Sequence, residues 1–316
     1  MKKKVVVTGA AGFIGSHLCE KLVSDGYEVS GIDCFTDYYD PARKRQNIEG
    51  LLKNDCFSLI EQDINSCDLL SVLAGADCVF HLAAQAGVRR SWGAEFSHYV
   101  QLNILATQKI LEAIRKLGGI RLVYSSSSSV YGETQDLPMK EDHRLRPISP
   151  YGATKLSGED LCELYYHNYG IRYVALRYFT VYGPRQRPDM AFSRFITSAF
   201  QGGGIEIYGD GKQTRDFTFV SDAVEANVLA SRYEGDERVF NIGGGSRVSI
   251  LEVLEIIESE TGKTLNVEFT QRALGDVTDT WADTSRASSE LGFSPHISLR
   301  EGLAREVGWY REYLGV

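Results

Sequence analysis

The stretch KVVVTGAAGFIGSHLCEKLVSDG, residues 4–26, decides the fold class. Its β-branched start predicts a buried strand. Ile14, Leu18 and Leu22 then lie four residues apart, the spacing of one helix face, and Gly26 is typical of a helix end. The same alternation continues, with strands expected at 27–33, 78–84 and 121–127 and a helix at 103–119. Alternation of this kind predicts an α/β fold of the Rossmann type, with a doubly wound parallel sheet.

Three glycines, Gly9, Gly12 and Gly15, stand between the first strand and the first helix. Glycine permits a tight turn and a close backbone approach, and a helix N-terminus offers free N–H groups to a pyrophosphate. Asp33 ends the second expected strand, at the distance from the glycines where a carboxylate binds the ribose of a dinucleotide. Because that carboxylate repels a 2′-phosphate, the sequence favours NAD over NADP.

Composition narrows the class of protein. The chain has 316 residues, a hydrophobic content of 43% and a net charge of −8, so nucleic acid is not expected as a partner. It has no apolar run long enough to span a membrane and no cleavage-site pattern after its basic start. Six cysteines without a C-x-x-C pair indicate reduced thiols in a cytoplasmic protein, and the Cys and His spacing predicts no metal. His17 and His81 are expected to be structural.

The regular alternation of strand and helix patterns ends at about residue 180, where long turn-rich stretches begin. We expect a dinucleotide-binding domain over 1–179, to which a segment near 217–242 returns, and a smaller α/β domain over 180–316 that binds the substrate. Helices are expected at 248–262 and 299–314. The serine run 125–129 follows a strand pattern, so we place it at a strand's carboxyl end, where α/β proteins build their sites.

A candidate catalytic group follows that strand. Tyr151 and Lys155 lie four residues apart on one helix face, and Ser127 is at the strand end. A phenol has a pKa near 10, which a nearby ammonium and a positively charged nicotinamide would lower. Tyr151 could then accept the proton of a substrate hydroxyl during hydride transfer, while Ser127 bonds the same oxygen.

The motifs TGAAGFIG (8–15), HLAAQAG (81–87), SSSSSVYG (125–132) and YGATK (151–155) resemble the extended short-chain dehydrogenase/reductase family, which includes nucleotide-sugar epimerases and dehydratases. The resemblance runs along nearly the whole chain and implies an enzyme, bound NAD, a UDP-sugar substrate and a homodimer formed through two helices of each subunit. It implies cofactor contacts from Gly9, Gly12, Phe13, Ile14, Gly15, Asp33, Asp63, Ile64, Leu82, Ala83, Ala84, Gln85, Tyr151, Lys155 and Tyr178, with Asn103 in support.

Two later motifs, at 209–226 and 275–287, resemble those in which the family holds the UDP group. Arg215 and Arg272 would bind the diphosphate and Asp276 the uridine ribose. By the same resemblance the full substrate set is Arg89, Ser127, Ser128, Ser129, Thr180, Arg187, Ile207, Tyr208, Arg215, Arg272 and Asp276.

The residues after Ser127 separate the chemistries of the family. Dehydratases carry an Asp-Glu pair at the positions of Ser128 and Ser129, and decarboxylases usually carry a glutamate at the latter. Epimerisation at carbon 4 needs neither carboxylate. The stretch 178–192, YFTVYGPRQRPDMAF, resembles UDP-glucuronate 4-epimerases, as does 33–47. Arg187 can offer a forked pair to a sugar carboxylate, and Thr180 a further donor.

Reversible conversion of UDP-glucuronate to UDP-galacturonate is therefore the expected reaction. The alternatives are a UDP-glucose/UDP-galactose 4-epimerase, an N-acetylhexosamine epimerase for which the small Thr280 leaves room, and a UDP-glucuronate decarboxylase. A redox-sensing dinucleotide-binding protein is the alternative that is not an enzyme. Such a protein typically loses the tyrosine or the lysine, whereas this chain keeps both.

Overall fold

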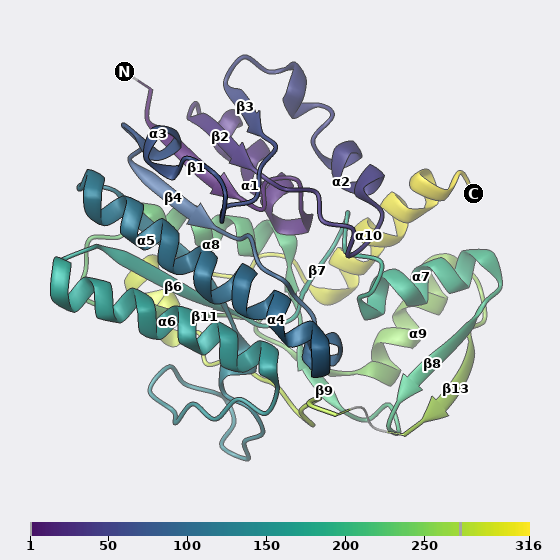
Figure 1. The fold of residues 1–316 in the computed structure, drawn as a ribbon. Helices are drawn as coiled ribbons and strands as arrows, with labels where there is room; N and C mark the ends of the chain where they lie inside the picture. The colour runs from purple at the N-terminus through teal and green to yellow at the C-terminus, as the bar shows by residue number, and fades with distance from the viewer. Residues whose placement is uncertain (1, 272–273) are drawn as a thin grey trace.

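The chain folds around a seven-stranded parallel sheet in the computed structural model, which describes residues 2–271 and 274–316 (Figure 1). The strand order is β11-β6-β5-β4-β1-β2-β3. The strands are β1 (Lys4–Thr8), β2 (Glu28–Ile32), β3 (Phe57–Ile60), β4 (Cys78–His81), β5 (Arg121–Ser127), β6 (Tyr173–Tyr178) and β11 (Val239–Ile242). The order reverses between β1 and β4, and ligands bind outside the carboxyl ends of strands at such a point. The predicted fold class is confirmed.

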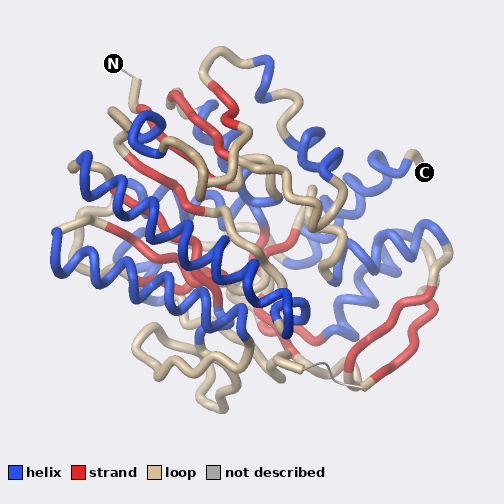
Figure 2. Tube along the Cα trace, viewed as in Figure 1, coloured by secondary structure: helices blue, strands red, loops and turns tan. Residues whose placement is uncertain are grey.

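Helices cover both faces of this sheet (Figures 1 and 2). The sequence of β1 explains the two layers, because alternate side chains of a strand point to opposite faces. Val5 and Val7 pack in one hydrophobic cluster and Val6 in another. The first cluster includes α1 (Phe13–Ser24) and α8 (Val220–Arg232), and the second includes α3 (Leu69–Leu73), α5 (Ala106–Leu117) and α6 (Pro150–Tyr169).

The helix expected at 103–119 begins earlier than its sequence pattern suggests. It starts as α4 (Phe96–Tyr99), passes through a π-helical segment at Val100–Leu105 and continues as α5. It ends where expected, at Gly118, whose φ of +71° suits a residue without a Cβ. The serine run is the end of a strand and not a linker, since β5 extends to Ser127.

The C-terminal part forms a smaller layer at one end of the sheet (Figure 1). β8 (Gly204–Tyr208) pairs in parallel with β13 (Asn266–Thr270), beside α7 (Ala191–Gln201), α9 (Ile250–Thr261) and α10 (Leu299–Leu314). Two short pairs complete it: β7 (Val181–Tyr182) with β10 (Thr218–Phe219), and β9 (Thr214–Asp216) with β12 (Arg247–Ser249). Both helices predicted after residue 245 are present, and a capping box of Ser249 and Glu252 fixes the start of α9. No helix of the described residues is long and apolar enough to cross a membrane.

Candidate active site

The glycine turn after β1 forms the floor of a cavity at the crevice of the sheet. Gly9 has a φ of +70°, and a Cβ added there would lie 2.9 Å from the backbone nitrogen of Ala83. A Cβ added at Gly15 would lie 2.0 Å from the carbonyl oxygen of Gly9. Any side chain at these two positions would therefore displace the backbone. This close packing brings the first turn of α1 to the cavity, where its free N–H groups suit a phosphate.

The cavity brings together the ends of several strands and the start of α6. Of the predicted cofactor residues, all but Asn103 line it: Gly9, Gly12, Phe13, Ile14, Gly15, Asp33, Asp63, Ile64, Leu82, Ala83, Ala84, Gln85, Tyr151, Lys155 and Tyr178. Asn103 lies behind the wall and is buried. Its Oδ1 accepts a hydrogen bond from the backbone N–H of Gln85 at 2.7 Å, and its Nδ2 donates to Thr154 Oγ1 at 2.9 Å. It therefore supports the cavity wall, as expected for a supporting polar residue.

Asp33 is held firmly at the end of β2. Its carboxylate accepts hydrogen bonds from the backbone N–H groups of Ala11 (3.2 Å) and Phe35 (2.9 Å). Lys44, on α2 (Pro41–Asn47), has its Nζ 3.5 Å from Asp33 Oδ1. These contacts hold the Asp33 carboxylate in a fixed position on the cavity wall. A carboxylate at this position can accept a hydrogen bond from a ribose hydroxyl and would repel a 2′-phosphate.

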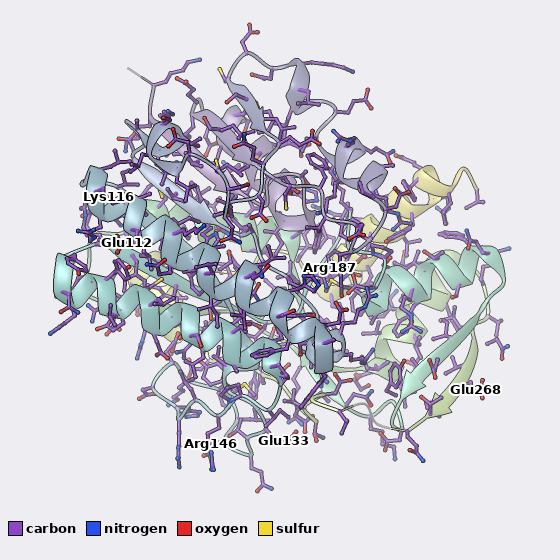
Figure 3. All side chains as sticks on the ribbon, in the orientation of Figure 1. Glu112, Lys116, Glu133, Arg146, Arg187 and Glu268 are labelled. Carbon is purple, nitrogen blue, oxygen red and sulfur yellow. The ribbon has the colours of Figure 1, made fainter. Side chains whose placement is uncertain are left out.

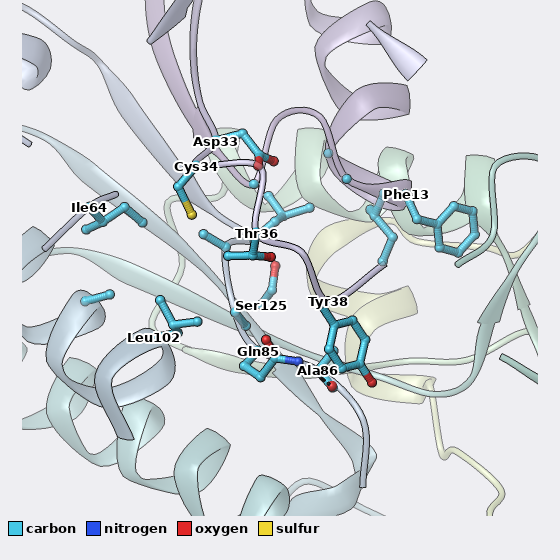
Figure 4. Close-up of a pocket in the computed structure, with 18 of the residues that line it drawn as sticks. Phe13, Asp33, Cys34, Thr36, Tyr38, Ile64, Gln85, Ala86, Leu102 and Ser125 are labelled. Carbon is cyan, nitrogen blue, oxygen red and sulfur yellow. Dashed lines mark hydrogen bonds between the residues drawn. The ribbon is translucent and has the colours of Figure 1, made fainter. Parts of the chain in front are cut away.

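The segment between β2 and α2 supplies lining residues that the sequence analysis did not place. Thr36, Tyr38, Tyr39 and Lys44 all face the cavity (Figure 4 draws Thr36 and Tyr38). The sequence of 33–47 resembles that of UDP-glucuronate 4-epimerases, and this resemblance indicates that the segment has a functional role. Nothing in its spacing shows which of its side chains turn inward, because it forms no regular element before Pro41.

The candidate catalytic residues lie at the start of α6. Ser149 caps this helix, its Oγ accepting a hydrogen bond from the N–H of Gly152 at 3.1 Å. Lys155 is buried, and its Nζ donates to the carbonyl oxygen of Ser125 at 2.8 Å. Burial lowers the pKa of Lys155 to about 8. The lysine is therefore a fixed donor on the cavity wall.

The pKa of Tyr151 differs from the direction expected from the sequence. Burial raises it above its usual value, and the opposing influences are a hydrogen bond with Ser127 and the positive charge of Arg187. Lys155 was expected to lower this pKa, but its ammonium is bonded to a carbonyl of β5 instead. An additional positive charge in the cavity would lower the pKa of Tyr151 and favour its ionisation. An oxidised nicotinamide has such a charge.

Arg187 enters the same cavity from the loop after β7 and lies near the middle of the molecule (Figure 3). Its Nε and Nη2 donate to the two oxygens of Asp189 at 3.0 and 2.9 Å. Burial acts to lower the pKa of Arg187, but the carboxylate of Asp189 outweighs it, so the pKa is raised. Nη1 makes no hydrogen bond within the described residues, which leaves it as a donor for a ligand. Thr180, between β6 and β7, is half-buried and is not among the described residues lining this cavity.

A second, polar cavity lies in the C-terminal part and includes Tyr208, Arg215 and Asp276. Arg89 reaches it from the sheet side: its Nη2 donates to Asp276 Oδ2 at 2.7 Å, and its guanidinium lies 4.0 Å from the centre of the Tyr208 ring. Arg215 donates to the carbonyl oxygens of Thr214, Val277 and Thr278. Four predicted substrate residues are therefore close together in space.

Other predicted substrate residues lie apart from this second cavity. Ile207 packs in the hydrophobic core, although its neighbour Tyr208 faces the cavity. Ser128 and Ser129 form the turn after β5, where the N–H of Ser129 donates to Ser127 Oγ at 3.2 Å. Arg272 lies outside the described residues.

His81 is a buried core residue. Its Nδ1 lies 2.8 Å from Thr8 Oγ1 and its Nε2 3.0 Å from Thr107 Oγ1. Within residues 2–271 and 274–316, no group of three or more His, Cys, Asp or Glu side chains is placed to hold a metal ion.

Comparison with known proteins identifies the family. Residues 6–306 match the family model described as GDP-mannose 4,6 dehydratase. The chain belongs to this family of extended short-chain dehydrogenases/reductases. The family includes a Bacillus subtilis (strain 168) relative named uncharacterized UDP-glucose epimerase YtcB, which is 46% identical over 309 residues, 97% of either chain.

Two further relatives of the family are named for glucuronate. The UDP-glucuronate 4-epimerase of Thermodesulfobacterium geofontis is 40% identical and covers 97% of this chain and 96% of its own. A crystal structure of UDP-glucuronic acid 4-epimerase from Bacillus cereus, in complex with UDP-glucuronic acid and NAD, superposes with a TM-score of 0.94 at 45% identity, covering 98% of this chain and 99% of that one. The cavity described above thus belongs to a fold that holds NAD in a close relative.

Proposed function

We propose that this protein is an NAD-dependent UDP-glucuronate 4-epimerase, which interconverts UDP-glucuronate and UDP-galacturonate through a 4-keto sugar. The observation that carries the proposal is the position of Arg187. Its guanidinium shares a cavity with Tyr151 and affects that residue's pKa, so a cation stands beside the proposed reacting centre. A neutral hexose has no group that needs a cation there, whereas a carboxylate at sugar carbon 6 does.

In the proposed mechanism NAD, when bound, supplies the acceptor that takes a hydride from sugar carbon 4 and later returns it. Tyr151 accepts the proton of the 4-hydroxyl and gives it back after the sugar has turned over. Ser127 bonds the same oxygen, as its hydrogen bond with Tyr151 suggests. Lys155 is fixed on Ser125 and is placed to hold the cofactor. No further acid or base is required, which agrees with serines at 128 and 129.

The 4-keto sugar of this substrate has its ketone β to the carboxylate, so it can lose carbon dioxide. We propose that Arg187 and Thr180 hold the carboxylate in both ring orientations and away from the geometry in which the carbon–carbon bond breaks. The loop geometry supports this for Arg187, because Asp189 fixes the guanidinium plane and leaves Nη1 for the ligand. A charged, hydrogen-bonded carboxylate also resists loss as a neutral molecule.

The UDP group is assigned to the second cavity. Asp276 is proposed to bind the uridine ribose and Arg215 the diphosphate. Arg89 holds Asp276 before the nucleotide arrives, because the two side chains form an ion pair at 2.7 Å. We propose that residues 1–179 form the cofactor-binding domain, which α8 and β11 complete, and that residues 180–316 form the UDP-sugar-binding domain.

We also propose a cytoplasmic homodimer formed through α5 and α6. These neighbouring helices leave four large hydrophobic side chains between 39% and 56% exposed: Leu105 just before α5, Leu117, Leu164 and Tyr169. Light scattering should give twice the mass of one chain for the wild type. The Leu164→Lys variant should have a lower mass, closer to that of a single chain. A monomeric wild type would refute the proposal.

A UDP-glucose 4-epimerase is the second candidate, because the B. subtilis relative is named for that substrate. The two candidates are separated by incubating the purified protein with each UDP-sugar, without added NAD, and identifying the products. We expect UDP-galacturonate from UDP-glucuronate, with little conversion of UDP-glucose. Conversion of UDP-glucose alone would favour the second candidate, and release of a UDP-pentose would indicate a decarboxylase.

A further inference from the structure

The loop of residues 183–190 carries two arginines that point in different directions. Arg187 enters the dinucleotide cavity, whereas Arg185 turns back toward α1. Arg185 has a φ of +67°, in the left-handed region that residues with a Cβ rarely adopt. Such a conformation persists where surrounding contacts hold it, and it often marks a functional segment.

The contacts of Arg185 reach the helix that binds the dinucleotide. Its Nη2 donates to Glu20 Oε1 at 2.7 Å, and its Nη1 donates to Ser16 Oγ at 3.3 Å. Ser16 Oγ donates in turn to the carbonyl oxygen of Phe13 at 3.1 Å. Phe13 lines the same cavity as Arg187. A short chain of hydrogen bonds therefore connects this loop with the first turn of α1.

A second contact joins the same two segments. Nε2 of His17 lies 2.9 Å from the carbonyl oxygen of Pro184, which can only accept a hydrogen bond. Burial, and then the charge of Arg185, lower the pKa of His17 to about 4, so the ring is neutral near pH 7 and its Nε2–H is the donor. The loop thus has two side-chain anchors on α1.

The middle of the loop is anchored on β7, α7 and α10. Gln186 is buried, and its amide donates to the carbonyl of Val181 at 3.2 Å and accepts from the N–H of Ser193 at 2.9 Å. The hydroxyl of Tyr310, on α10, donates to the carbonyl of Gln186 at 3.3 Å. Arg187 therefore follows a residue whose backbone and side chain are both fixed.

We propose that Arg185 is a positioning residue for substrate recognition. Its bonds to α1 hold the loop in the turn that directs Arg187 into the cavity, where the sugar carboxylate is bound. The inference rests on the proposed function, and it assigns a role to the arginine of this motif that does not reach the cavity. Without Arg185 the left-handed turn can relax, and the guanidinium of Arg187 moves away from the carboxylate.

The test measures the affinities of the NAD-bound protein for UDP-glucuronate, UDP-glucose and UDP by calorimetry. Glu20→Gln removes the ion pair without altering the loop itself. Arg185→Gly removes the guanidinium but keeps a residue that tolerates the left-handed backbone. The matched control is Asp25→Asn, which removes a carboxylate at the end of α1 that is paired with Lys21 at 2.6 Å and does not contact the loop.

We expect Arg185→Gly and Glu20→Gln to weaken binding of UDP-glucuronate by about tenfold or more, as displacement of a positioned group does. Binding of UDP-glucose and UDP should stay as in the wild type, and Asp25→Asn should change none of the three. Equal losses for both sugars, or an unchanged ratio of the two affinities, would overturn the proposal.

Arg187→Ala separates this inference from the proposed function. If it leaves the ratio of the two affinities unchanged, Arg187 does not recognise the carboxylate, and both proposals are wrong. If Arg187→Ala abolishes the preference for UDP-glucuronate but the Arg185 and Glu20 variants retain this preference, the proposed function stands. The positioning role of Arg185 is then wrong.

Discussion

The groups that meet the cofactor and the groups proposed to meet the sugar nucleotide are held in different ways. The dinucleotide cavity rests on backbone: a glycine turn that admits no side chain, and Asp33, whose carboxylate is fixed by two backbone N–H groups. Two side chains proposed to meet the UDP-sugar, Arg187 in this cavity and Asp276 in the second one, are instead held by ion pairs with other side chains. Arg187 is paired with Asp189, and Arg89 with Asp276.

This difference has a consequence for binding. NAD meets the glycine turn and Asp33, which are already in place, so its binding requires little rearrangement. A UDP-sugar meets side chains whose positions depend on the Arg187–Asp189 and Arg89–Asp276 ion pairs. Discrimination between sugars is therefore expected to depend on how the loop side chains are held. Retention of the cofactor is expected to depend on the glycine turn and Asp33 at the ends of the sheet strands.

The largest effect is expected from Tyr151→Phe, since the phenolic oxygen is the proposed proton acceptor. Turnover should fall by about 10²–10⁴-fold, while NAD content and UDP binding remain as in the wild type. The control is Tyr166→Phe, an exposed tyrosine on the same helix. Turnover of Tyr151→Phe within about threefold of wild type would remove Tyr151 from the mechanism.

Arg187→Ala should have the next largest effect, and only on the acidic sugar. Loss of a partly buried charge pair costs about 2–5 kcal/mol, so the affinity for UDP-glucuronate should fall steeply while that for UDP-glucose hardly changes. Some UDP-pentose should also form by decarboxylation. Arg194→Ala, a neighbouring arginine on α7, is the control. If the affinities for both sugars fall equally and no UDP-pentose forms, the UDP-glucose 4-epimerase becomes the favoured candidate.

Asp33 should determine which dinucleotide the protein retains. We expect protein unfolded after purification to release NAD, as measured by chromatography of the supernatant. Asp33→Asn should weaken NAD retention by about 1.5–3 kcal/mol, the range for a hydrogen bond to a charged group. Release mainly of NADP by the wild type would show that the ribose argument is wrong.

A smaller effect is expected from His81, whose pKa burial lowers to about 3. Below about pH 6.5 the unfolded chain binds a proton on this ring, but the folded chain does not. The free energy of unfolding should therefore decrease as the pH is lowered below 6.5. For this group the decrease is at most about 1.4 kcal/mol per pH unit. Urea titrations at several pH values should show a shallower slope for His81→Gln than for the wild type. His167→Gln, an exposed control on α6, should keep the wild-type slope, and equal slopes in all three would contradict the assignment.

The sequence predicted the first cavity better than the second for a physical reason. The glycine turn, Asp33 and the Tyr151–Lys155 spacing are local patterns, and parallel strands bring their ends to one edge. Arg89 and Asp276 are separated by 187 residues, and their pairing depends on how the C-terminal part folds back. Local spacing also could not show that Lys155 turns to Ser125, or that Arg185 adopts a left-handed backbone away from the cavity.

The most direct test of the mechanism uses UDP-glucuronate carrying deuterium at sugar carbon 4, incubated with the purified protein without added NAD. The account predicts that UDP-galacturonate forms with the deuterium still on carbon 4, because the same hydride leaves and returns within one active site. Loss of deuterium to the solvent, or failure to form any 4-epimer, would contradict it.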